Sequence, residues 1–230
     1  MNEKEQGLAI FLKQLPIFCN LSLDDCVTIV KHASVEKFES RCLVQSLGTY
    51  HHHLYIVITG QLDMVATSSQ GHEMVVAVFG PKSMSSWLAI FHDTPAERSL
   101  VATKDTRLLA IPTQYIKHIL ARNPELYPQV LNFEGKRFRA ALNWQQLVLT
   151  KNRTKRIAAI LLMLIEISGD QSESPSIKLT HEQLMKTTQC SRQALHVSLK
   201  SLQDIGLMKQ AYGRIDVLKK AELLEFSRHG

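Results

Sequence analysis

The spacing of apolar residues changes at Pro112-Thr113, from the short runs typical of strands to the longer period of helices. Before this point, the runs at 54–65, 73–79, 99–102 and 107–111 are rich in β-branched and aromatic residues, and glycine and proline separate them. Several short strands separated in this way are typical of a small barrel or roll. The pattern therefore predicts an α+β chain with an N-terminal, jelly-roll-like β-roll and a helical C-terminal part.

Three local signals mark where elements of the first half begin or turn. Ser22 is suited to cap a helix that runs to about His32. Gly60 separates two apolar runs and indicates either a hairpin or a corner between them. Pro112 ends the last strand, and we expect Thr113 to cap the helix that follows.

The longest helical stretch runs from about Pro128 to Leu149. A helix of about 22 residues spans ~33 Å, which is longer than a small roll covers. Its apolar residues form a loose heptad seam, so we expect a second copy of the helix to cover it. The alternative is a helix packed lengthwise on its own domain. The residues expected at the dimer interface are Leu131, Phe138, Ala141, Leu142, Gln145 and Val148.

The positive charge of the chain lies mostly in its last third. From Thr150 to Gly230 there are 13 Lys and Arg against 8 Asp and Glu, whereas the rest of the chain has 14 against 13. Clustered cations gain affinity for a polyanion by releasing counterions from its phosphates. The charge therefore favours a nucleic-acid partner for the C-terminal part, although a solvated basic surface has the same composition.

Composition also bears on location and redox chemistry. No apolar run reaches the length of a membrane span, and the N-terminus lacks the order of a secretion signal, so we expect a cytoplasmic protein without a membrane partner. The cysteines Cys19, Cys26, Cys42 and Cys190 form no C-x-x-C pair. We therefore expect reduced, mostly buried thiols and no metal site.

The segment from Leu179 to Leu202 carries two helix-start signals in close succession. Thr180 and Gln183 form a capping box for a short first helix, and Ser191 is suited to cap a second helix. The apolar residues of the second helix recur at helical spacing and face inward. Two short helices joined by a tight turn are the arrangement that places a recognition helix in the DNA major groove.

The outward side chains of this second helix suit DNA contacts. Arg192 has the donors to bind guanine O6 and N7, and Gln193 can pair with adenine N6 and N7. Val197 either meets a thymine methyl or packs inside. The side chains expected at the DNA are Thr180, Ser191, Arg192, Gln193, His196 and Lys200, with Ser191 and Lys200 holding phosphates.

Two short apolar runs after Gly206 predict a two-stranded wing. They flank the segment Ala211 to Arg214, and its tip presents Tyr212 and Arg214 to a DNA backbone. Together with the two helices, this wing completes a winged helix-turn-helix.

The order of these elements resembles the Crp/Fnr family of bacterial transcription regulators. The resemblance rests on residues 14–18, Leu21-Ser22, 54–64, Arg98-Ser99 and the segment from Leu179 to the wing. It implies a sensor domain at 1–122, a dimerisation helix at 123–149 and a DNA-binding domain at 150–230. It also implies a homodimer on a pseudo-palindromic promoter site, with RNA polymerase as a further partner. Gln189 departs from the family, because members often carry a turn glycine there.

The resemblance also implies a small effector bound by the β-roll. Family members often bind a cyclic nucleotide through a Gly-Glu pair and an Arg-Ser pair, with hydroxyls of the dimer helix at the base. This chain keeps Arg98-Ser99, has Ser85-Ser86 in place of Gly-Glu, and has Ala141 and Leu142 at the helix positions. Because these polar partners are lost, cyclic AMP in the usual mode is doubtful, and the effector stays unidentified.

Other family cofactors find little support in the residues. An iron–sulfur cluster requires an N-terminal cysteine cluster, and only Cys19 and Cys26 lie close together there. Haem requires axial ligands, for which no ligand spacing exists. The candidates are His51, His52, His53, His72, Cys42 and Met74. An exposed histidine loop is the interpretation we favour.

Two other classes of function compete with a DNA-binding regulator. A cyclic-nucleotide-responsive module that acts through protein contacts would depend on Arg98 and not on Arg192. An enzyme would require a nucleophile–base motif, a phosphate-binding glycine loop or a metal spacing, and the sequence shows none of these. We therefore do not expect catalysis.

Overall fold

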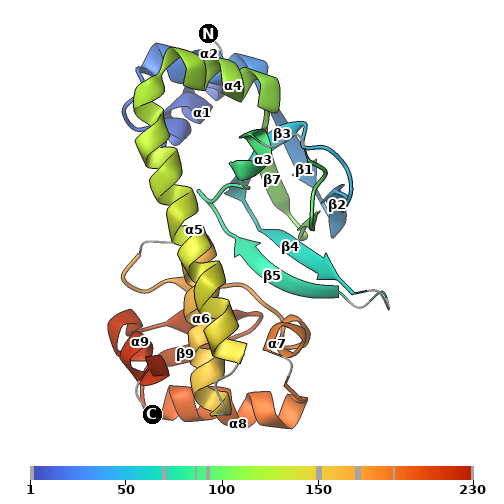
Figure 1. Cartoon of the computed structure of the whole chain (residues 1–230), viewed down its shortest axis with the longest axis vertical. Helices are drawn as coiled ribbons and strands as arrows, with labels where there is room; N and C mark the ends of the chain where they lie inside the picture. The colour runs from blue at the N-terminus through green and yellow to red at the C-terminus, as the bar shows by residue number, and fades with distance from the viewer. Residues whose placement is uncertain are drawn as a thin grey trace. The chain divides into compact units, whose positions relative to one another are not determined.

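The computed structural model describes residues 3–68, 71, 73–85, 87–91, 94–148, 152–168, 172–188 and 190–228, without the side chains of 88, 89, 144–148 and 168. The chain divides into two compact units. The first comprises Met1–Gly60 and Pro81–Gly135, and the second comprises Gln61–Gly80 and Lys136–Gly230. Strands occur in both units beside helices, so the predicted α+β class is confirmed (Figure 1).

The first unit is a set of antiparallel strands with helices at its start and end (Figure 1). Its central sheet has the order β1-β7-β3, and β2 pairs with β6. The strands are β1 (Ser34–Phe38), β2 (Cys42–Gln45), β3 (His53–Thr59), β6 (Ser99–Ala102) and β7 (Thr106–Pro112). The helices are α1 (Glu3–Lys13), α2 (Leu23–His32), α3 (Leu88–Phe91), α4 (Thr113–Arg122), the 3-10 turn η1 (Pro124–Leu126) and the first part of α5 (Tyr127–Val148).

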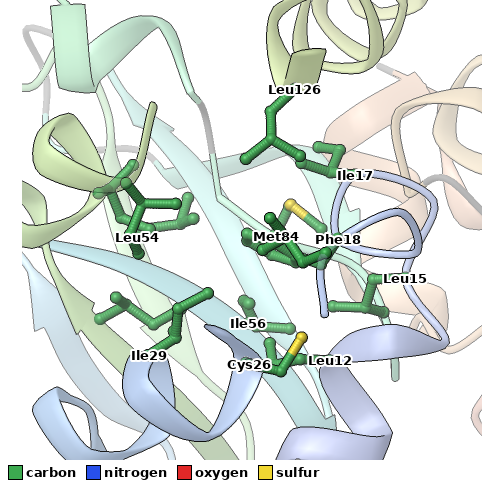
Figure 2. Close-up of a cluster of buried hydrophobic side chains, with 14 of the residues drawn as sticks. Leu12, Leu15, Ile17, Phe18, Cys26, Ile29, Leu54, Ile56, Met84 and Leu126 are labelled. Carbon is green, nitrogen blue, oxygen red and sulfur yellow. The ribbon is translucent and has the colours of Figure 1, made fainter. Parts of the chain in front are cut away.

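One apolar core joins the helices and strands of this unit. Figure 2 shows Phe18, Leu54 and Met84 converging in it from separate segments. Cys26 is buried in the same core, and burial is the main reason that the pKa of its thiol rises to about 11, with nearby Lys13 lowering it and Asp25 raising it. This thiol is therefore protonated at neutral pH.

The local signals of the first half are mostly confirmed. Ser22 caps α2 by accepting a hydrogen bond from the Asp25 N–H. Gly60 is a corner rather than a hairpin, because β3 pairs with β7 and not with β4. Its φ is +81°, and a Cβ there would lie 2.5 Å from Thr106 Cα, so both backbone angle and space require glycine.

Thr113 does not cap the helix that follows β7. It is the first residue of α4, and its hydroxyl donates to the His51 carbonyl at 3.1 Å. The prediction was wrong by one position, because the helix already includes Thr113, and its N-cap is Pro112, which has no side-chain hydrogen-bonding group.

The second unit combines a β-hairpin with the C-terminal elements. The hairpin is β4 (Leu62–Thr67) with β5 (Glu73–Phe79), and the remaining elements are α6 (Arg153–Ser168), β8 (Ser176–Ile177), α7 (His181–Thr188), α8 (Arg192–Asp204), β9 (Met208–Ala211), β10 (Arg214–Val217) and α9 (Lys220–Arg228). The small sheet has the order β8-β10-β9. Helix α6 is the centre of this unit, because α8, α9 and β5 all pack against it.

The β4–β5 hairpin is held to α7 by hydrogen bonds as well as by packing. The Thr187 hydroxyl donates to the Val75 carbonyl at 2.8 Å, and Gln183 Nε2 donates to Asp63 Oδ2 at 3.0 Å. Asp63 also accepts from Gln61 Nε2 at 2.6 Å and is almost completely buried. A hairpin that precedes α7 by about a hundred residues of chain is therefore part of the same packed unit.

The cysteines only partly match expectation. All four are free thiols, but Cys26 alone is buried, while Cys19 and Cys42 are exposed and Cys190 is half-buried. The expectation of mostly buried thiols is therefore wrong. Among the described residues, no helix has both the length and the apolar content of a membrane span.

Candidate nucleic-acid interface

Both predicted helix caps in the C-terminal segment are present. The Thr180 hydroxyl accepts from the Gln183 N–H at 3.1 Å, and Gln183 Oε1 accepts from the Thr180 N–H at 2.9 Å. This is the reciprocal capping box, and it starts α7 at His181. Ser191 accepts from the Ala194 N–H at 3.3 Å and starts α8 at Arg192. The connecting Gln189 lies outside the described residues.

Helix α8 divides into a buried side and an exposed side. Leu195, Leu199 and Leu202 are buried, which fixes the helix against its own unit. Because their spacing follows the helical period, the opposite side of the helix points to solvent. The exposed side chains include the four of this helix that were predicted to contact DNA, namely Arg192, Gln193, His196 and Lys200.

An open hollow of about 530 Å³ lies beside the start of α8. It is lined by His181 and Met185 of α7 and by Arg192, Gln193, Leu195 and His196 of α8. Three of the predicted DNA contacts therefore share one concave surface with a histidine from the preceding helix.

The predicted wing is a β-hairpin with a two-residue turn. Strands β9 and β10 pair antiparallel from Met208 to Val217, and Tyr212 and Gly213 form the turn, with φ of +64° at the glycine. The Tyr212 side chain is fully exposed. Arg214 is exposed, and its Nε forms an ion pair with Asp216 Oδ1 at 2.9 Å. The tip therefore presents one aromatic ring and one cation to solvent.

Most of the side chains predicted to bind an effector in the first unit form hydrogen bonds within that unit. The Ser85 hydroxyl is buried and accepts from the Tyr55 N–H at 3.0 Å. The Ser99 hydroxyl accepts from the Leu47 N–H at 3.0 Å. Arg98 is exposed and donates to the Glu97 carbonyl at 2.6 Å. Ser86 lies outside the described residues.

Just before α3, a backbone N–H group is hydrogen-bonded to a carboxylate of α5. Glu134 is buried, and its Oε1 accepts from the Trp87 N–H at 2.7 Å. The Trp87 ring is completely buried, with Nε1 2.9 Å from Met84 Sδ and the ring against Phe18. The polar start of α3 therefore already has an anionic partner within its own unit.

The predicted histidine loop is only partly exposed. His52 is exposed, while His51 and His53 are half-buried. Burial lowers the pKa of His51, and a smaller lowering comes from the positive charge of His52. Among the described residues, no three His, Cys, Asp or Glu side chains are grouped as metal ligands. His72 lies outside those residues.

Helix α5 carries exposed apolar side chains. Leu131 is 69% exposed, Phe138 63% and Leu142 48%, and Ala141 is exposed beside them. The side chains of Gln145 and Val148, which the same prediction includes, are not described. Large apolar groups left exposed on one helix are typical of a surface that a partner covers.

Some features of the interface were missed from the sequence. His181 lines the hollow, although no role was predicted for it from the sequence. Strand β8 and helix α9 were also missed. Strand β8 has only two residues, too few for any periodic signal.

Comparison with known families divides the chain in the same order as the predicted elements. A family described as Cyclic nucleotide-binding domain matches residues 35–123, and a family described as Crp-like helix-turn-helix domain matches residues 155–226. The whole of α5 (Tyr127–Val148) lies between the two matches.

Individual relatives agree with these matches. The chain is 23% identical to the cyclic AMP receptor protein of Thermus thermophilus over 214 residues. This alignment covers 93% of this chain and 97% of the relative. Over 150 residues it is 25% identical to a CRP-like cAMP-activated global transcriptional regulator of Mycobacterium tuberculosis, covering 64% of this chain and 66% of the relative. Among solved structures, FixK2 from Bradyrhizobium japonicum has a TM-score of 0.69 at 13% identity, over 86% of this chain and 98% of that one.

Proposed function

Because this chain belongs to the Crp/Fnr family of transcription regulators, we propose that it binds a pseudo-palindromic promoter site on double-stranded DNA as a homodimer. The observation that carries the proposal is the division of α8, which exposes Arg192, Gln193 and His196 while its leucines are buried. Two such helices about one DNA turn apart, ~34 Å, contact two half-sites in successive major grooves.

Each predicted side chain has a separate task in this proposal. Arg192 and Gln193 contact base edges, because their donors and acceptors match guanine and adenine in the major groove. The remaining predicted residues position the protein on phosphates, which fixes register without selecting sequence. They are Thr180, Ser191, His196, Lys200, Tyr212 and Arg214.

The dimer of this proposal is formed along α5. A second copy of the helix covers Leu131, Phe138 and Leu142, which are otherwise exposed. The exposure of these side chains supports the proposal, because burying a Leu or Phe side chain stabilises an assembly by about 1.5–3 kcal/mol. The functional division we propose is a sensor domain at 1–122, a dimerisation helix at 123–149 and a DNA-binding domain at 150–230.

The proposed location of the protein follows from its proposed DNA partner. DNA binding at promoters takes place in the cytoplasm of a bacterium, and family membership implies contact with RNA polymerase. A ligand of the sensor domain acts only if it has different affinity for two arrangements of the dimer.

We further propose that cyclic AMP, named in the titles of the relatives, is not bound here in the usual family mode. The hydroxyls of Ser85 and Ser99 already accept backbone N–H groups, and the Trp87 N–H already donates to Glu134. A phosphate at this segment would meet a resident carboxylate, and like charges repel strongly in a buried site.

Selection of bound duplexes from a random pool tests the DNA proposal. We expect enrichment of a two-fold symmetric sequence, and we expect Arg192→Ala to weaken the enriched site by about 5- to 150-fold per half-site, since a bidentate base contact contributes ~1–3 kcal/mol. Arg228→Ala, which removes the same charge from the end of α9, is the control and should leave sequence preference unchanged. Equal affinity for selected and random DNA at physiological salt would refute the proposal.

A further inference from the structure

One apolar side chain interrupts the polar exposed side of α8. Val197 is 61% exposed, while the other bulky aliphatic residues of this helix, Leu195, Leu199 and Leu202, are buried. The alternative that Val197 packs inside is therefore excluded. Its neighbours on the same side are polar, with Gln193 and His196 before it and Lys200 after it, and all three are exposed.

Helix geometry places Val197 close to Gln193 on the side proposed to face DNA. Residues four apart lie on the same side of a helix, with Cβ atoms about 5–6 Å apart. The rise of 1.5 Å per residue puts Val197 ~6 Å further along the helix axis than Gln193. Since successive base pairs are about 3.4 Å apart, that distance corresponds to one or two base pairs.

The chemistry of a valine at this point selects one kind of base. Thymine presents an apolar C5 methyl group in the major groove, whereas cytosine presents an amino donor and no methyl. A valine cannot satisfy a donor or acceptor, so it costs free energy beside a base edge that loses water there. Against a methyl group it gains contact instead.

We propose that Val197 is a specificity-determining residue that packs against the C5 methyl of a thymine, one or two base pairs from the base pair that Gln193 contacts. This inference rests on the proposed DNA-binding function. It assigns the thymine preference to a side chain with no hydrogen-bonding group, beside the polar contacts of Arg192 and Gln193.

The test uses the full-length dimer and its selected site. Each thymine of the half-site is replaced in turn by deoxyuridine, which removes the methyl and keeps every hydrogen-bonding group. At one position we expect about fourfold weaker binding per half-site, because burying one methyl-sized group contributes ~0.8 kcal/mol. Replacing both half-sites should give about sixteenfold when the two effects are independent. At that position, 5-methylcytosine should bind better than cytosine.

Variants of the protein decide whether Val197 senses the methyl. Val197→Ala, which removes both γ-methyl groups, should lose most of the difference between thymine and deoxyuridine sites, and Val197→Thr, which keeps one of these methyl groups, should retain more of it. Ile205→Ala is the matched control, because Ile205 is 51% exposed but lies at the C-terminal end of α8, ~12 Å further along the axis than Val197. It should leave the thymine preference unchanged.

The outcomes separate this inference from the proposed function. A selected site at which wild-type protein binds every deoxyuridine duplex as tightly as thymine overturns the role of Val197 alone. The same conclusion follows if Val197→Ala keeps the full thymine preference. Failure to select any site above random DNA overturns both proposals together.

Discussion

The start of α8 and the segment before α3 are both polar starts of helices, but their surroundings differ. At α8 the side chains of Arg192 and Gln193 are exposed beside an open hollow. Before α3 the Trp87 ring is buried, and its backbone N–H is bonded to Glu134 of the same unit. The first arrangement leaves polar groups for an external partner, and the second satisfies them internally.

In the predicted effector segment, the retained family residues already form hydrogen bonds within their own unit. Arg98 and Ser99 are present in the sequence, yet the Ser99 hydroxyl already accepts from Leu47 and Arg98 points a donor to its neighbouring carbonyl. A polar group gains less from a ligand when the ligand must replace a bond that the group already makes.

The largest effect is expected from Trp87→Ala. Removing a fully buried tryptophan leaves a cavity and should lower the free energy of unfolding by about 3–5 kcal/mol. Denaturant unfolding followed by circular dichroism measures it. Leu43→Ala is the control, since Leu43 is more than half exposed and its loss should change stability by less than about 0.5 kcal/mol. Equal losses in the two variants would mean that the Trp87 site is open.

Substitution of Glu134 should have a smaller effect on stability, and it tests the hydrogen bond to the Trp87 N–H specifically. Glu134→Ala leaves the buried Trp87 N–H without its acceptor and should cost about 1–3 kcal/mol more than Glu134→Gln, whose amide oxygen can still accept. The comparison of the two variants by chemical denaturation isolates the acceptor from the loss of charge. If both variants lose the same stability, the hydrogen bond to Trp87 does not close the segment.

At the open site, the cap of α8 should have an effect of about 1 kcal/mol. Ser191→Ala removes the acceptor of the Ala194 N–H, and loss of an N-cap typically costs ~0.5–2 kcal/mol. Because Arg192 and Gln193 follow directly, fraying of this turn should also weaken specific DNA binding. Ser191→Asp keeps an acceptor and should restore stability while its charge still disfavours nearby phosphates. Identical stability of all three proteins would contradict the cap.

The sequence predicted the elements whose local chemistry decides them. The capping box at Thr180, the cap at Ser191 and the wing turn at Gly213 are each set by residues close in the chain, and the structure has all three. The leucine spacing of α8 predicted its buried side for the same reason. The placement of the exposed side chains at the DNA remains a prediction.

Features that depend on distant residues could not be predicted in this way. The hydrogen bonds from Thr187 to Val75 and from Gln183 to Asp63 join segments more than a hundred residues apart. Likewise, Glu134 is a polar residue in a helical pattern, and nothing near it in the chain indicates that it meets Trp87. Thr113 begins α4 instead of capping it, and its hydroxyl donates to the remote His51 carbonyl, which nothing near it in the chain indicates.

The smallest effect is expected from cyclic AMP itself. A ligand that binds the folded state stabilises it by about 2.7 kcal/mol when its concentration is 100 times its Kd, which raises the melting temperature measurably. With the Ser85 and Ser99 hydroxyls and the Trp87 N–H already bonded, we expect cyclic AMP to leave the melting temperature unchanged, while the selected DNA duplex raises it. A saturable rise with cyclic AMP that Arg98→Ala abolishes would show that the closed segment opens for this ligand, and the contrast with α8 would then fail.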